Sequence, residues 1–160
     1  MPKPLIVRLT QNEIWHSVIQ GGIRRLEAMR HGRRDKFQPG DPINGWSRDI
    51  EGAAAECAVA KGLHLFWSGI SDVNASDVDG YQVRYSRGTD LVIRNGDTDS
   101  DRFVLVTGAI PEFAIHGWLI ASEGKQPGYL KNPGGYGPAY FVPLEALHAL
   151  EELQASYETF

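Results

Sequence analysis

Asp77, Gln82 and Arg84 flank Asp79-Gly80, a dipeptide that is typical of two-residue hairpin turns. In such a hairpin Asp77 pairs with Gln82, and their Cβ atoms lie roughly 4.5–5.5 Å apart. Because side chains alternate along a strand, Arg84 shares their face. One carboxylate, one amide oxygen and one permanent cation are therefore expected to converge beside the turn. The opposite face is expected to be apolar, with Val78, Tyr81, Val83 and Tyr85.

A second carboxylate comes from an alanine-rich segment, 48–62, which we expect to be a helix with Ser47 as its cap. Glu56 shares a stripe with small apolar residues, so we expect it to face the packed side of the helix. Gly52, one turn earlier, predicts a close approach of another backbone. Glu51 lies about 140° away around the helix and is expected to face elsewhere.

The elements that would position these residues are two helices, several strands and a closing helix. Thr10-Gln11-Asn12-Glu13 reads as a capping box for a helix over about 11–31, whose apolar positions include Ile14, Val18, Ile23 and Leu26. Short segments rich in β-branched and aromatic residues predict strands at 64–67, 73–78, 81–85, 91–94, 103–107 and 113–120. Pro143 suits the first turn of a final helix. This order predicts an α+β fold in which helices flank a mixed, mostly antiparallel sheet.

Composition and charge narrow the class of protein. The chain has 160 residues, 42% of them hydrophobic, so we expect one domain over residues 1–160 with a packed core. A single cysteine argues against a disulfide framework. No apolar run is long enough for a membrane span or a signal peptide, so we expect a cytoplasmic protein.

Charge is unevenly distributed along the chain. Residues 1–50 carry nine Lys/Arg against five Asp/Glu, whereas residues 51–160 carry seven against fifteen. The basic residues of the first part can meet phosphates or form a solvated helix face. A glycine- and proline-rich tract, 126–141, holds four aromatic residues. These rings can stack on bases from a flap or lie buried in a loop that wraps the core.

Three segments resemble the PD-(D/E)XK nuclease superfamily: Gly52-Ala53-Ala54-Ala55-Glu56, Ser76-Asp77 and Gln82-Val83-Arg84. The superfamily pattern is a helical Glu after a Gly, an Asp that ends a strand, and an acid or Gln followed two residues later by Lys. The longer run through Phe103–Gly108 and Pro111–Trp118 resembles small uncharacterised phage and prophage proteins. The resemblance to the phage and prophage proteins covers about residues 10–145, and the resemblance to the superfamily implies a restriction-endonuclease-like core.

The resemblance implies hydrolysis of nucleic-acid phosphodiesters, usually in DNA, with Mg²⁺ or Mn²⁺ as the cofactor. Asp77 would anchor the metal ion, and Gln82, the Val83 carbonyl and Glu56 would complete its oxygen ligands. Arg84 would hold the phosphate or the attacking water. Nucleic-acid-binding positions would be Arg24, Arg25, Arg33 and Arg34, and the location would be the host cytoplasm if a phage encodes the protein.

Two residues depart from the superfamily pattern. Gln82 replaces the commoner acid and removes one negative charge from the metal site. Arg84 replaces Lys, so it stays protonated and binds phosphate but cannot accept a proton.

These departures keep alternatives open. One is a catalytically inactive module of the same fold that binds nucleic acid or protein. Another is an inhibitor of a host defence protein, whose acidic C-terminal part mimics DNA. A homodimer is compatible with the size of the chain.

Overall fold

The computed structural model describes residues 3–32, 42–70 and 75–155. Its helices are α1 (Gln11–Arg30), α2 (Pro42–Leu63), α3 (Ala121–Gly124) and α4 (Leu150–Ala155). Its strands are β1 (Leu5–Arg8), β2 (Tyr81–Tyr85), β3 (Leu91–Ile93), β4 (Arg102–Ala109), β5 (Glu112–Ile120), β6 (Leu130–Lys131) and β7 (Ala139–Val142). Turns of 3₁₀ helix lie at Pro127–Tyr129, Pro133–Gly135 and Leu144–Ala146. The predicted α+β class is confirmed.

The strands form two sheets. The larger has the order β1-β5-β4-β2, and β2 pairs with β4 in parallel whereas its other pairs are antiparallel. The smaller sheet has the order β3-β7-β6 and is antiparallel. The expectation of a mixed, mostly antiparallel arrangement is therefore confirmed. Because β2 lies at the edge of the larger sheet, its outer backbone groups need other partners.

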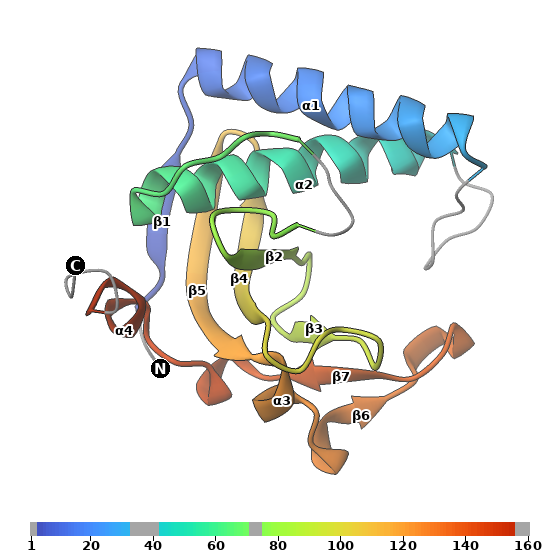
Figure 1. Ribbon diagram of the computed structural model, residues 1–160, viewed down its shortest axis with the longest axis vertical. Helices are drawn as coiled ribbons and strands as arrows, with labels where there is room; N and C mark the ends of the chain where they lie inside the picture. The colour runs from blue at the N-terminus through green and yellow to red at the C-terminus, as the bar shows by residue number, and fades with distance from the viewer. Residues whose placement is uncertain (1–2, 33–41, 71–74, 156–160) are drawn as a thin grey trace.

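The larger sheet separates two hydrophobic cores. Helices α1 and α2 lie together at one end of the molecule, and the smaller sheet lies at the other (Figure 1). Tyr81 and Val83 of β2 pack into the core that α2 covers. Phe103 and Leu105 of the adjacent strand β4 pack into the core formed with β3 and β7. Successive side chains of these strands thus enter different layers.

Helix α1 begins at the predicted capping box, in which Thr10 Oγ1 accepts from the Glu13 amide at 3.3 Å and Glu13 accepts from the Thr10 amide at 2.6 Å. Its apolar positions are not the buried ones, however. Ile23 is 48% exposed and Leu26 is 56% exposed, whereas the buried residues are Ser17, Gly21 and Arg25. The apolar spacing thus predicts the helix, but small and polar residues form most of its buried face.

Gly21 explains why α1 packs on its small and polar side. A Cβ at this position would lie 2.5 Å from the Ile50 Cα and 2.8 Å from the Asp49 carbonyl oxygen. The absence of that Cβ lets the α2 backbone cross directly over Gly21.

Several predicted boundaries need correction. Helix α2 begins at Pro42, so Ser47 lies inside it and is not its cap. Residues 64–67 form no strand, and of the predicted strand 73–78 only Val78 forms a β-bridge, with residues 73 and 74 outside the described part. A 3₁₀ turn follows Pro143, and α4 starts only at Leu150. In the described residues no helix is long and apolar enough to cross a membrane.

Candidate functional site

The Asp79-Gly80 turn forms as predicted. Val78 and Tyr81 exchange two backbone hydrogen bonds, of 3.0 and 2.8 Å, and both turn residues have positive φ. The ribbon does not continue past this pair. Instead of pairing with Gln82, Asp77 turns its side chain onto β2, and its Oδ2 accepts from the Val83 amide at 2.8 Å.

This contact follows from the position of β2 in the sheet. The parallel pairing with β4 leaves the other edge of β2 without a strand, so a side chain satisfies the Val83 amide. The amide and carbonyl of one strand residue point to the same edge. The Val83 carbonyl therefore lies on this edge too, next to Asp77.

Glu56 projects from α2 and is 7% exposed, which confirms that it faces the packed side of the helix. Arg24 of α1 donates to both of its carboxylate oxygens, at 2.8 and 2.6 Å. The Trp67 indole donates to Glu56 Oε2 at 3.0 Å. Gly52 does not have its predicted role, because a Cβ there would meet no atom within 4 Å; the close backbone approach occurs at Gly21.

The pKa values of Glu56 and Asp77 are both raised. Burial raises the pKa of Glu56, the bonds from Arg24 oppose this rise, and the charge of Asp77 adds to it. Burial also raises the pKa of Asp77, against the lowering effect of the Val83 amide and of Arg84 and Arg24. Two partly desolvated carboxylates with raised pKa values are characteristic of functional sites.

Gln82 and Arg84 lie on the other face of β2, away from α2. The Arg84 guanidinium stacks on the Phe103 ring at 4.7 Å, and its Nη2 donates to both Asp97 carboxylate oxygens at 2.7 Å. Glu56 and Arg84 are therefore separated by the strand. The charges of both Arg84 and Arg24 act to lower the pKa of Asp77, which lies at the edge of β2.

Two of the predicted nucleic-acid-binding residues, Arg24 and Arg25, do not form an exposed basic face. Arg24 pairs with Glu56, and Arg25 Nε lies 3.1 Å from Asp49 Oδ2, so both cations join α1 to α2. Their side chains are 16% and 7% exposed. A phosphate would have to compete with these ion pairs, and the binding role of both residues stays a prediction. Arg33 and Arg34 lie outside the described residues.

The described residues include no cluster of three or more His, Cys, Asp or Glu side chains that would hold a metal ion. Two oxygen donors lie at the edge of β2, the Asp77 carboxylate and the Val83 carbonyl, and the buried Glu56 carboxylate of α2 interacts electrostatically with Asp77. This donor set fits Mg²⁺, which commonly takes one or two carboxylates and retains several waters. Glu56 would exchange its Arg24 contact for the cation.

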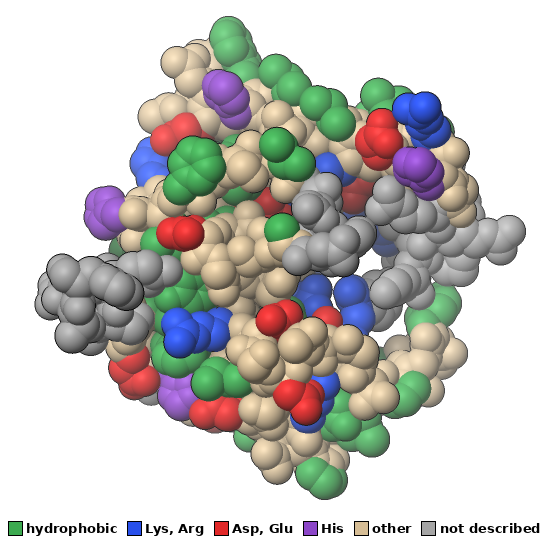
Figure 2. Space-filling model, in the orientation of Figure 1, with side chains coloured by type: hydrophobic (Ala, Val, Ile, Leu, Met, Phe, Trp, Pro, Cys, Tyr) green, Lys and Arg blue, Asp and Glu red, His purple; other side chains and the backbone are tan. Residues whose placement is uncertain are grey.

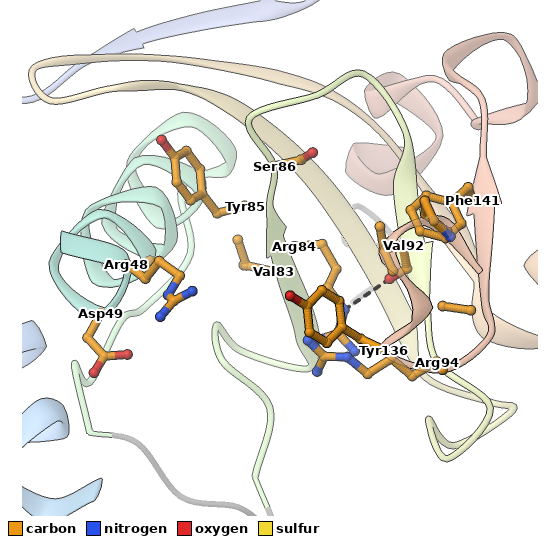
Figure 3. Close-up of a pocket in the computed structure, with 14 residues that line it drawn as sticks. Arg48, Asp49, Val83, Arg84, Tyr85, Ser86, Val92, Arg94, Tyr136 and Phe141 are labelled. Carbon is orange, nitrogen blue, oxygen red and sulfur yellow. Dashed lines mark hydrogen bonds between the residues drawn. The ribbon is translucent and has the colours of Figure 1, made fainter. Parts of the chain in front are cut away.

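A cavity of about 630 Å³ opens between α2, β2, β3, β7 and the turn Pro133–Gly135 (Figure 3). Gly52 and Val83 line it, so it adjoins the edge of β2. It also contains three arginines, Arg48, Arg84 and Arg94, and three aromatic residues, Tyr85, Tyr136 and Phe141. Sequence reasoning missed Arg48 and Arg94 because they lie far apart in the chain and belong to no motif.

Comparison of the chain with protein-family models, with curated proteins and with solved structures finds no match in any of the three.

Proposed function

We propose that the protein is a metal-dependent nuclease that hydrolyses phosphodiester bonds of nucleic acid, with DNA as its main substrate and Mg²⁺ or Mn²⁺ as its cofactor. One observation carries this proposal. The charge of Asp77, beside a strand edge, raises the pKa of the helical Glu56, and Asp77 accepts from Val83, which lines a cavity that contains three arginines. Carboxylates bind the metal ion, and arginines bind phosphate.

The chain's own residues have distinct tasks in this proposal. Asp77, Glu56 and the Val83 carbonyl would hold the metal ion, which would supply activation of water and stabilisation of charge on the phosphate. Arg84 offers a planar cation to the phosphate and stays protonated throughout. Arg24 compensates the charge of Glu56 when no other cation is near.

Incubation with plasmid, linear and single-stranded DNA tests the proposal, with Mg²⁺, Mn²⁺ or EDTA. We expect cleavage with either metal, none with EDTA, and a loss of at least about 100-fold for Asp77→Ala. Glu145→Gln, which changes an exposed carboxylate, is the matched control and should cleave normally. Absence of metal-dependent cleavage above the Asp77→Ala background on every substrate would refute the proposal.

A second candidate is a binding module without catalysis. It is favoured by the fact that Glu56 and Arg84 already have bidentate partners, Arg24 and Asp97. This candidate predicts salt-sensitive binding of nucleic acid that survives both EDTA and Asp77→Ala. Binding that requires the cation and disappears in Asp77→Ala would count against it.

A further inference from the structure

The cavity beside β2 has the dimensions of a small-molecule site. Its volume of about 630 Å³ lies within the range of roughly 300–1,000 Å³ of pockets that enclose small ligands. In a duplex the bases are paired and stacked, so a duplex cannot enter a cavity of this size. A single unstacked nucleotide can.

The lining of the cavity is basic. It contains three arginines and one aspartate, Asp49, which is paired with Arg25, and Asp97 outside the lining is paired with Arg84. In Figure 2 basic side chains lie along one edge of a hollow on this side of the molecule, next to acidic side chains. An anion that lies among the three guanidiniums would reduce their mutual repulsion, and a phosphate fits their planar fork.

Arg84 is held in place for such a contact. Its hydrogen bonds within the described residues use Nε, to the Val92 carbonyl, and Nη2, to Asp97. These bonds leave Nη1 available. Burial lowers the pKa of Arg94 and the charge of Arg84 lowers it further, which is the effect of two cations held close together.

An exposed aromatic ring lines the same cavity as these cations. Tyr136 is 60% exposed and is drawn in front of Arg84 and Arg94 in Figure 3. Its loop is shaped by Gly134, Gly135 and Gly137, which have φ values of 81°, 73° and 111°. Other residues rarely adopt these conformations. The Gly137 amide also donates to the Asn132 side chain at 3.1 Å, so the loop presents Tyr136 in a defined position.

We propose that this cavity binds one unpaired nucleotide, with its phosphate on Arg48, Arg84 and Arg94 and its base against Tyr136. The proposal rests on the proposed function and assigns its substrate class: single-stranded nucleic acid, or a strand end that has separated from its partner. Stacking accepts any base, so binding is expected to show little sequence preference.

Equilibrium binding without metal ions tests this proposal, because cleavage is then absent. The probes are a fluorescein-labelled dT12 strand, a U12 strand and a blunt 12-base-pair duplex. We expect a single strand to bind more tightly than the duplex. Comparison of dT12 with U12 decides between DNA and RNA as the source of the strand. Equal affinity for the duplex and both single strands would overturn the proposal.

Two variants probe the cavity itself. Tyr136→Ala removes the exposed ring and should weaken single-strand binding by about 5- to 100-fold. Gly52→Phe should weaken it as well, because a Cβ at Gly52 meets nothing within 4 Å and the ring would fill the cavity. Phe66→Ala removes another exposed ring, 76% exposed and outside the cavity, and should bind normally. Normal binding by both cavity variants would contradict the proposal.

The two proposals can fail separately. Metal-dependent cleavage of duplex DNA that Tyr136→Ala leaves unchanged would overturn the nucleotide site and keep the nuclease. Single-strand binding that depends on Tyr136, with no cleavage under any metal condition, would support the nucleotide site and refute the nuclease.

Discussion

The fold holds the Asp77 carboxylate in a position where its charged form is unfavourable. It lies half-buried at the edge of β2, where burial raises its pKa above the ordinary value of 3.8. Protonation therefore favours the folded state. This contribution to stability is present in full below pH 3.8 and is lost as the pH rises through the raised pKa of the folded protein. Residues of functional sites commonly lower the stability of the folded protein in this way.

Asp77→Asn is accordingly expected to raise the thermal stability of the protein at pH 7. The neutral amide avoids the cost of burying a charge, and its oxygen can still accept from the Val83 amide. We expect a gain on the order of 1 kcal/mol, which thermal unfolding measured by circular dichroism would detect. The gain should disappear near pH 3.5, whereas Glu145→Gln should change little at either pH. A lower melting temperature for Asp77→Asn at pH 7 would contradict this interpretation.

Arg24 has the opposite effect on stability because it compensates a buried charge. Arg24→Ala leaves Glu56 buried without its cation, which should cost about 3–5 kcal/mol at pH 7. The loss should shrink in acid, since protonated Glu56 needs no counter-ion. Urea unfolding at pH 7 and pH 4 measures both effects. A cost that stays the same at the two pH values would show that the ion pair is not its source.

The packing of α1 on α2 depends on which glycine faces the partner helix. Gly21 touches the α2 backbone, whereas a Cβ at Gly22 would meet only the Trp46 ring, at 3.9 Å. The two neighbours therefore form a matched pair. The sequence alone indicates only that Gly21 and Gly22 both lower the stability of helix α1.

Gly21→Ala should destabilise the protein by at least about 1–3 kcal/mol, because the helices must move apart. Gly22→Ala should be neutral or stabilising by up to about 1 kcal/mol, because alanine favours the helix. Chemical denaturation of both variants measures the difference. Equal effects at the two positions would mean that α1 does not cross α2 at Gly21.

At the level of the whole molecule, the outward face of α1 is unusually apolar. Its large side chains are 42–59% exposed and recur at intervals of roughly three or four residues: Trp15, Val18, Ile19, Ile23, Leu26 and Met29. Such a stripe marks an interaction surface. These six side chains are uncharged, and a helix face can match its own copy about a two-fold axis. A second copy of this chain is therefore the expected occupant, in line with the homodimer that the size allows.

Ile19→Glu combined with Leu26→Glu should dissociate this dimer, because the charges would be buried against one another. Sedimentation equilibrium over a range of concentrations would show a dimer for the wild type and a monomer for the variant. Glu145→Gln, away from α1, should remain dimeric. A wild-type protein that stays monomeric at every concentration would exclude the α1 interface.

The sequence by itself determined the features that depend on neighbouring residues. The capping box begins α1, the β-branched segments identify β2 to β5, and Asp79-Gly80 makes its turn. The amphipathic expectation also placed Glu56 on the packed side of its helix. Each of these depends on residues a few positions apart, where spacing and local hydrogen bonding decide the outcome.

Only the tertiary structure decided how these elements meet. The parallel pairing of β2 with β4 sends Asp77 to the Val83 amide, and the close crossing at Gly21 turns the apolar side of α1 outward. The cavity joins Arg48, Arg94 and Tyr136 from three distant segments. Contacts of this kind join residues tens of positions apart and depend on packing, which local periodicity does not specify.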